Sequence, residues 1–241
     1  MPADQLPPPA VPAPRAAPTT TPATAPGTTP AATAGSGPGS TGAWARLLDA
    51  NARWAQGRSS AGESRAPVRR AALVRSQAPV AAVLGCSDSR VPVELVLDQG
   101  LGDLFVVRTA GHVLDTSVVG SLEYAVGQLG VGLLVVLGHE GCGALAAAGA
   151  VLEGAPLPDG ALGEVVEALR PAVEEARRRG ARTPLEVSRH HARSTAQLLQ
   201  RSAVLGSAAE RGALEVVAAS YSLLTGLVTT STGAAVARAG G

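Results

Sequence analysis

The chain has 241 residues and a nearly even charge balance, with 20 Lys and Arg against 19 Asp and Glu. This balance gives no sign of the basic surface that binds nucleic acid, and the apolar runs are too short to span a bilayer. The two cysteines are too few for a disulfide scaffold, so we expect reduced thiols in a soluble cytoplasmic protein.

The N-terminal segment consists mostly of Pro, Ala, Thr, Gly and Ser. Because it has few bulky apolar side chains to bury, its ordering entropy is not offset, and we expect residues 1–42 to be disordered. It also lacks the apolar core of a secretory signal. We therefore predict a single α/β domain over residues 43–232, followed by a frayed end over 233–241.

A first helix is predicted over residues 43–56, because apolar residues recur at helical spacing and Gly57 follows. The helix contains Trp44 and Trp54, the only two tryptophans of the chain. We expect both to be core or interface anchors, because a helix outside the main domain needs a surface on which to bury the face that carries them, and a partner subunit could supply it. Residues 59–70 are polar and are predicted to form a loop that leads into a short helix.

Four apolar runs predict the buried strands of a parallel sheet, because helical stretches separate them. The predicted strands are 80–85, 104–107, 131–137 and 214–219, with a short edge strand expected within 221–228. The expected helices run from Pro92 to Leu97, from Thr116 or Ser117 to Leu129, from Gly141, from 160 to 179, and from a capping box at Thr183 and Glu186.

Two polar clusters follow the first and third predicted strands. The first is Cys86-Ser87-Asp88-Ser89-Arg90, and the second runs from Gly138 to Gly143. The carboxyl ends of parallel strands meet at one edge of a sheet, so we expect Cys86, His139 and Cys142 to converge there. Two thiolates and one imidazole suit Zn²⁺, and three protein ligands with a fourth position open are typical of a catalytic zinc site.

Asp88 and Arg90 lie two residues apart in the first cluster, where they can form a bidentate ion pair beside the predicted metal. Asp88 would then either occupy the fourth zinc position or be held by Arg90 so that water binds instead. Cys142 lies at the start of a predicted helix, where the helix dipole favours the thiolate that metal binding needs.

The paired clusters Cys86-Ser87-Asp88-Ser89-Arg90 and His139-Glu140-Gly141-Cys142 resemble those of the β-class carbonic anhydrases. The likeness extends over residues 43–228 and includes 105–108, 120–126, 135–139 and 221–228. It implies a four-stranded parallel sheet with an added edge strand, flanked by helices. It also implies a homodimer or homotetramer in which the N-terminal helix packs on a partner subunit.

The resemblance implies a zinc lyase that reversibly hydrates carbon dioxide to bicarbonate and a proton. Position by position, the zinc ligands would be Cys86, His139 and Cys142, and the catalytic pair would be Asp88 and Arg90. Hydroxide on the zinc would attack CO₂ while the Asp-Arg pair gates the site and orients the hydroxide.

The same resemblance suggests roles for further residues. Gln99 is the candidate for a bicarbonate-binding glutamine, although it is displaced by one residue from the usual pattern, and Tyr124 matches a tyrosine that walls the apolar pocket near the dimer contact. His112 replaces a common asparagine, which suggests a proton relay or a hydrogen-bonding role. His190 and His191 are expected at the surface or at an interface.

Three alternative functions remain open at this point. A zinc hydrolase on the same scaffold could act on carbonyl sulfide or carbon disulfide instead of CO₂. A non-catalytic protein could use the zinc as a structural clip or as a bicarbonate sensor. A thiol redox protein could use Cys86 and Cys142 without metal.

Overall fold

The computed structural model describes residues 40–61, 64 and 66–231. The predicted tail over residues 1–39 and the predicted frayed end over 233–241 lie outside the described residues. Residues 40–42, which we assigned to the tail, belong instead to the first helix. Within the described part of the chain, no helix is both long and apolar enough to cross a membrane.

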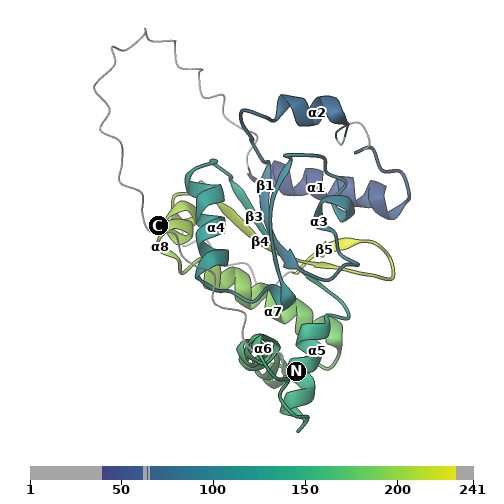
Figure 1. Ribbon diagram of the computed structural model, residues 1–241, viewed down its shortest axis with the longest axis vertical. Helices are drawn as coiled ribbons and strands as arrows, with labels where there is room; N and C mark the ends of the chain where they lie inside the picture. The colour runs from purple at the N-terminus through teal and green to yellow at the C-terminus, as the bar shows by residue number, and fades with distance from the viewer. Residues whose placement is uncertain (1–39, 62–63, 65, 232–241) are drawn as a thin grey trace, which may run out of the picture. The chain divides into compact units, whose positions relative to one another are not determined.

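A five-stranded sheet organises the described residues (Figure 1). The strand order is β2-β1-β3-β4-β5; the first four strands are parallel, and β5 is antiparallel to β4. The strands are β1 (Ala81–Cys86), β2 (Leu104–Thr109), β3 (Leu133–His139), β4 (Glu215–Tyr221) and β5 (Val228–Thr230). This confirms the predicted parallel sheet with one added edge strand. Every residue of β1 and β3 is buried, which explains their continuous apolar sequences.

Helices cover both faces of this sheet (Figure 1). One face packs against α1 (Ser40–Ala55) and α3 (Val93–Val96), and the other packs against α4 (Thr116–Gly127), α7 (Pro184–Leu199) and α8 (Ala203–Glu210). Successive strand residues point to opposite faces, so Ala81 and Val83 join the first core, whereas Ala82 and Leu84 join the second.

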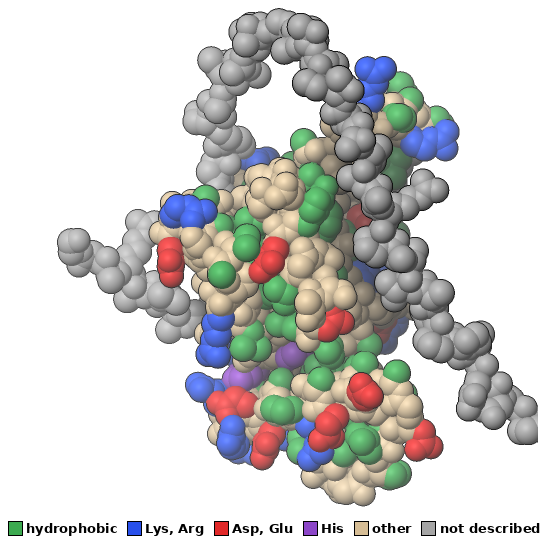
Figure 2. Space-filling view, turned by 60° about the vertical axis from the view of Figure 1, so that its left-hand side comes forward, with side chains coloured by type: hydrophobic (Ala, Val, Ile, Leu, Met, Phe, Trp, Pro, Cys, Tyr) green, Lys and Arg blue, Asp and Glu red, His purple; other side chains and the backbone are tan. Residues whose placement is uncertain are grey.

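The remaining helices are α2 (Pro67–Ala72), the 3₁₀ turn η2 (Ala110–His112), α5 (Gly143–Leu152) and α6 (Ala161–Arg178). Helices α5 and α6 pack together in a third apolar cluster that includes Cys86 and Cys142. On the face seen in Figure 2, basic and acidic side chains are interspersed with apolar ones, in keeping with the even charge balance.

Helix α1 makes several polar and apolar contacts with its own chain. Trp44 is buried, and its Nε1 donates to Thr230 Oγ1 at 3.0 Å. The Asn51 amide donates to the Val96 carbonyl oxygen at 2.8 Å, and its Oδ1 accepts from the Val228 N–H at 2.7 Å. These contacts tie α1 to α3 and β5, and they make Trp44 an anchor of the chain's own core.

Two details of the helices correct the sequence predictions. The N-cap of α4 is Asp115, not Thr116 or Ser117, because the Asp115 carboxylate accepts from the Val118 N–H at 2.8 Å. Helix α8 was not predicted at all. Its eight residues follow the N-cap Ser202 in a stretch too short to show a helical repeat.

The capping box that begins α7 is confirmed. The Thr183 hydroxyl accepts from the Glu186 N–H at 3.2 Å, and the Glu186 carboxylate accepts from the Thr183 N–H at 2.9 Å. Pro171 lies inside α6, which continues through it as one helix.

Candidate metal centre

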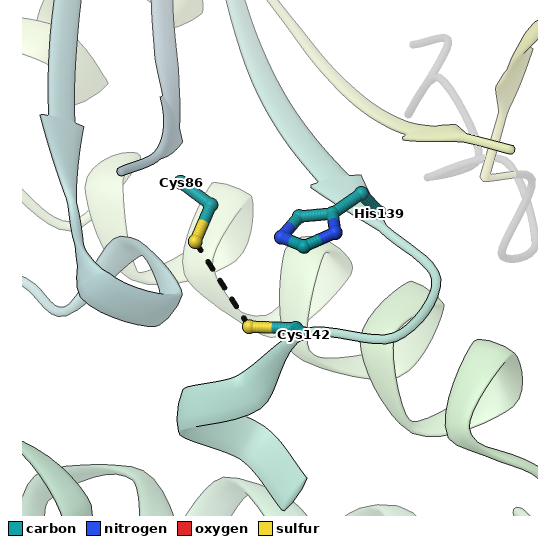
Figure 3. A group of neighbouring side chains, drawn as sticks. All are labelled: Cys86, His139 and Cys142. Atoms are coloured by element: carbon teal, nitrogen blue, oxygen red, sulfur yellow. Dashed lines mark hydrogen bonds between the residues drawn. The ribbon is translucent and has the colours of Figure 1, made fainter. Parts of the chain in front are cut away.

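Three side chains that could hold a metal ion point toward one another at the carboxyl ends of β1 and β3 (Figure 3). Cys86 ends β1, His139 ends the adjacent strand β3, and Cys142 is the N-cap of α5. All three are buried, and their ligand atoms lie within 4.8 Å of one another. The two sulfur atoms are 4.0 Å apart. The structure thus brings together the three metal ligands predicted from the sequence.

The imidazole of His139 is oriented to bind through Nε2. Its Nδ1 lies 2.8 Å from the Glu140 carbonyl oxygen, so Nδ1 carries the proton and donates it. Nε2 then holds the lone pair, and it is buried without a hydrogen-bond partner among the described residues. A buried, unpartnered nitrogen beside two thiols is a donor set that Zn²⁺ would satisfy, so the residues present fit the metal.

The two thiols share one hydrogen bond, which lowers the pKa of one thiol and raises the pKa of the other. The contact with Cys142 is the main reason why the pKa of Cys86 falls to about 4, with smaller contributions from the backbone N–H groups of Asp88 and Gly111. The same contact raises the pKa of Cys142, because a second thiolate would lie beside the first. A divalent cation between the sulfurs would remove this repulsion, and metal binding would then release protons from the site.

Asp88 is held by Arg90 rather than by the metal-ligand group. Arg90 Nε and Nη2 donate to the two Asp88 carboxylate oxygens at 2.9 and 2.7 Å, and Arg90 Nη2 also donates to the Gly141 carbonyl oxygen at 3.0 Å. The hydrogen bond from Arg90 keeps the pKa of Asp88 well below its ordinary value. The carboxylate is therefore ionised and able to accept a hydrogen bond.

Arg108 fixes the backbone of the first cluster, a role that the sequence analysis missed. Its Nε and Nη2 donate to the carbonyl oxygens of Cys86 and Asp88 at 2.8 and 2.7 Å. Arg108 can do so because β2 pairs with β1 and places it opposite Gly85. The available signal was an arginine at the end of an otherwise apolar predicted strand.

Gln99 lies away from the metal centre within the chain. Its side-chain amide donates to the Leu97 and Asp98 carbonyl oxygens at 2.7 and 3.0 Å. It also lines a hollow together with α1 and Val80, the residue before β1. Cys86 ends β1, and five residues of strand at about 3.3 Å each separate the two ends of β1 by roughly 16 Å.

Tyr124 lies on α4 and is also apart from the three ligands. Its side chain is 49% exposed, and its ring centroid is 6.2 Å from that of Phe105 on β2. The structure therefore gathers five of the seven predicted site residues and separates Gln99 and Tyr124 from them.

Both histidines were expected at the surface or at an interface, but His191 is buried within its own chain, whereas His190 is partly exposed. The helical repeat of α7 turns His191 toward the sheet, where its ring stacks on the buried ring of His112. Burial lowers the pKa of His112 well below its ordinary value, which keeps this ring neutral. Neither His112 nitrogen has a hydrogen-bond partner among the described residues, so the observed contacts do not connect it to a proton path.

The chain is similar to known proteins over most of its described length. A family model described as carbonic anhydrase matches residues 81–228, which include all five clustered site residues. The chain is 44% identical over 182 residues to carbonic anhydrase 2 of Mycobacterium tuberculosis, covering 75% of this chain and 87% of that protein.

Two further comparisons agree with this match. The chain is 43% identical over 187 residues to a carbonic anhydrase of Mycolicibacterium smegmatis, covering 77% of this chain and 90% of that protein. A solved structure of a Coccomyxa β-carbonic anhydrase in complex with acetazolamide aligns with a TM-score of 0.61 at 26% identity. That alignment covers 76% of this chain and 84% of the Coccomyxa chain.

Proposed function

The chain belongs to the β-carbonic anhydrase family, and from this premise we propose that it is a zinc enzyme that reversibly hydrates CO₂ to bicarbonate and a proton. The observation that carries the proposal is the buried cluster of Cys86, His139 and Cys142, whose ligand atoms lie within 4.8 Å of one another. Structural zinc sites are normally closed by four protein ligands, whereas catalytic sites use three. The cluster therefore favours catalysis over a structural clip.

The tautomer of His139 and the position of Cys142 suit this site to a zinc ion. Cys86, His139 and Cys142 would hold the zinc, which would act there as a Lewis acid and lower the pKa of a water molecule toward neutrality. The Glu140 carbonyl oxygen keeps His139 in the tautomer that presents Nε2. The position of Cys142 at the N-terminus of α5 offsets part of the rise in its pKa, because the N–H groups of Leu145 and Ala144 lower it.

We assign Asp88 and Arg90 the roles of orienting and gating. The ionised Asp88 carboxylate would accept a hydrogen bond from the reacting water and direct its lone pair toward CO₂. Arg90 would hold that carboxylate in place, which its two hydrogen bonds to Asp88 support. If Arg90 released it, the Asp88 carboxylate would be free to turn toward Cys86, His139 and Cys142 and close the site.

We propose that the chain functions as a homodimer or homotetramer. Strand β2 is an edge strand of the sheet, and all of its residues are only partly buried, including Phe105, Val106 and Val107. An apolar edge strand is a ready surface for another chain, and a second copy would cover it. Tyr124 lies beside Phe105 and would then contribute to a substrate pocket at this contact. A role for Gln99 in binding bicarbonate stays a prediction that its position in the single chain does not support.

The two cysteines are relevant to the cellular location of the protein. Both cysteines are free, although their sulfur atoms are 4.0 Å apart. In cytosolic proteins thiols are kept reduced, and closely spaced cysteines there are more often metal ligands than disulfides. This supports our proposal that the protein works in the cytoplasm.

Stopped-flow measurement of CO₂ hydration with the zinc-loaded protein tests the proposed function. We expect turnover that a chelator abolishes and that added zinc restores. Carbonyl sulfide and carbon disulfide are tested in parallel, because the same scaffold could act on them. Hydrolysis of these sulfur compounds without CO₂ hydration would overturn the assignment.

A further inference from the structure

A second layer of polar contacts lies behind the metal centre. The Gly111 N–H donates to Cys86 Sγ at 3.4 Å. On the other side of the same residue, the Gly111 carbonyl oxygen lies 2.7 Å from His191 Nε2. A carbonyl oxygen only accepts, so His191 Nε2 carries a proton and donates it. Two hydrogen bonds thus connect His191 on α7 to Cys86 at the end of β1.

The turn that carries Gly111 needs to be held in place. Gly111 has φ 61°, and a Cβ at this position would lie 2.8 Å from Leu169 Cδ1 and 3.2 Å from Ala144 Cβ. The next residue, His112, also has a positive φ of 45°, which is unfavourable for a residue other than glycine. Two successive residues in this conformation direct the Gly111 N–H toward the thiol. His191 Nε2–H donates to the Gly111 carbonyl oxygen, which lies in the peptide group between Gly111 and His112.

The ring of His191 is itself fixed by stacking. Its plane lies 15° from that of His112, with the ring centroids 4.8 Å apart. Burial lowers the pKa of both histidines, so the two rings stack as neutral groups without charge repulsion. His191 cannot turn away from Gly111 without breaking this stack.

We propose that His191 is a positioning residue of the metal centre, resting on the zinc site proposed above. Its Nε2–H holds Gly111 so that the Gly111 N–H points at the Cys86 sulfur. A hydrogen bond from a backbone N–H stabilises a thiolate and fixes the direction of its lone pairs. The His112 ring supports the arrangement through its stack on His191.

Paired substitutions separate this role from simple core packing. His191→Leu fills a similar volume without a donor, whereas His191→Gln keeps an N–H at a similar reach. His190→Gln is the control, because His190 is the neighbouring residue on α7 and is partly exposed. The readouts are the zinc dissociation constant, from competition with a chromophoric chelator, and the sulfur-to-cobalt charge-transfer band of Co²⁺-substituted protein.

We expect His191→Leu to weaken zinc binding by about 10-fold to 100-fold and to shift the charge-transfer band. His191→Gln should recover most of the affinity, and His190→Gln should match the unsubstituted chain. Wild-type affinity and spectrum in His191→Leu would overturn the proposal, as would equal losses in His191→Leu and His191→Gln. If His191→Leu does not fold, His191→Asn replaces it, because its amide is too short to reach Gly111. Unchanged affinity and spectrum in His191→Asn, or losses equal to those in His191→Gln, would then overturn the proposal.

These readouts are independent of the reaction. If the chain binds zinc in the predicted order of variants but does not hydrate CO₂, the proposed function fails and the positioning role stands. If it hydrates CO₂ and His191→Leu binds zinc normally, the positioning role fails and the function stands.

Discussion

Arg90 donates two parallel hydrogen bonds to Asp88, from Nε to Oδ1 at 2.9 Å and from Nη2 to Oδ2 at 2.7 Å. The Arg90 side chain is 54% exposed, whereas that of Asp88 is only 15% exposed. Arg90 also reaches the Gly141 carbonyl oxygen of the second cluster. This one guanidinium therefore fixes the carboxylate and links the two segments that carry Cys86, His139 and Cys142.

Substitution of Arg90 tests the proposed gating role. Arg90→Ala removes the donors that hold Asp88, so we expect CO₂ hydration to fall by about 100-fold or more while zinc remains bound. Stopped-flow kinetics and metal analysis measure the two effects separately. Arg170→Ala removes an exposed ion pair on α6 and serves as the control. Turnover within a few-fold of the unsubstituted enzyme in Arg90→Ala would exclude the role.

Arg108 offers a test of the backbone support beneath the cluster. Arg108→Met keeps much of the side-chain length but removes both donors to the Cys86 and Asp88 carbonyl oxygens. We expect zinc affinity to fall by about 10-fold to 100-fold, because groups that orient metal ligands typically contribute this much. Arg108→Lys should recover only part of the zinc affinity, since one ammonium group does not reproduce the two parallel donors of the guanidinium group. An unchanged zinc dissociation constant in Arg108→Met would contradict this account.

The buried carboxylate of Asp98 anchors the loop after α1. It accepts hydrogen bonds from Arg53 Nε, the Ser59 hydroxyl, and the backbone N–H groups of Ser60 and Ala61. Asp98→Asn removes the charge and replaces one acceptor by a donor. We expect it to lower the free energy of unfolding by about 1–3 kcal/mol at neutral pH. Urea unfolding measures this, with the exposed Asp49→Asn as the control.

The same variant predicts a pH dependence. Burial alone would raise the pKa of Asp98, but the hydrogen bonds from the 59–61 loop lower it below its ordinary value. A carboxyl group whose pKa is lowered on folding stabilises the protein above its unfolded pKa of about 3.9 and loses that stabilisation as the pH falls through the folded value. The stability gap between the unsubstituted chain and Asp98→Asn should therefore shrink below about pH 4. A gap that widens on acidification would refute this role.

Tyr124 tests the proposed contact between copies of the chain. Tyr124→Arg places a charge beside the apolar edge strand β2, so we expect the oligomer to dissociate at micromolar concentration. Sedimentation velocity measures the change from oligomer to monomer. Leu162→Arg changes a similarly exposed apolar residue on α6 and should leave the oligomer intact. A persistent oligomer in Tyr124→Arg would place the interface elsewhere.

The sheet and the clustering of Cys86, His139 and Cys142 could be predicted because local patterns determine them. Cys86 and His139 each follow an apolar run, and adjacent parallel strands end at the same edge of the sheet. The parallel direction of β1 and β3 is therefore enough to place Cys86 and His139 at one edge of the sheet. The polar residues that mark both clusters stand out against these apolar runs.

The supporting residues could not be predicted because they depend on how elements are rotated and paired. His190 and His191 are neighbours on α7, and only the rotation of that helix decides which one faces the sheet. The inward residues Ser188, Ala192 and Thr195 are small or polar, so they give no strong apolar stripe to define that rotation. Arg108 likewise acquires its role only through the pairing of β2 with β1.

Metal analysis of purified protein tests the central claim most directly. The account predicts one equivalent of zinc per chain in the unsubstituted protein and its loss in Cys142→Ala, because the cluster then keeps only Cys86 and His139. Unsubstituted protein without stoichiometric zinc, or a full equivalent retained by Cys142→Ala, would contradict it.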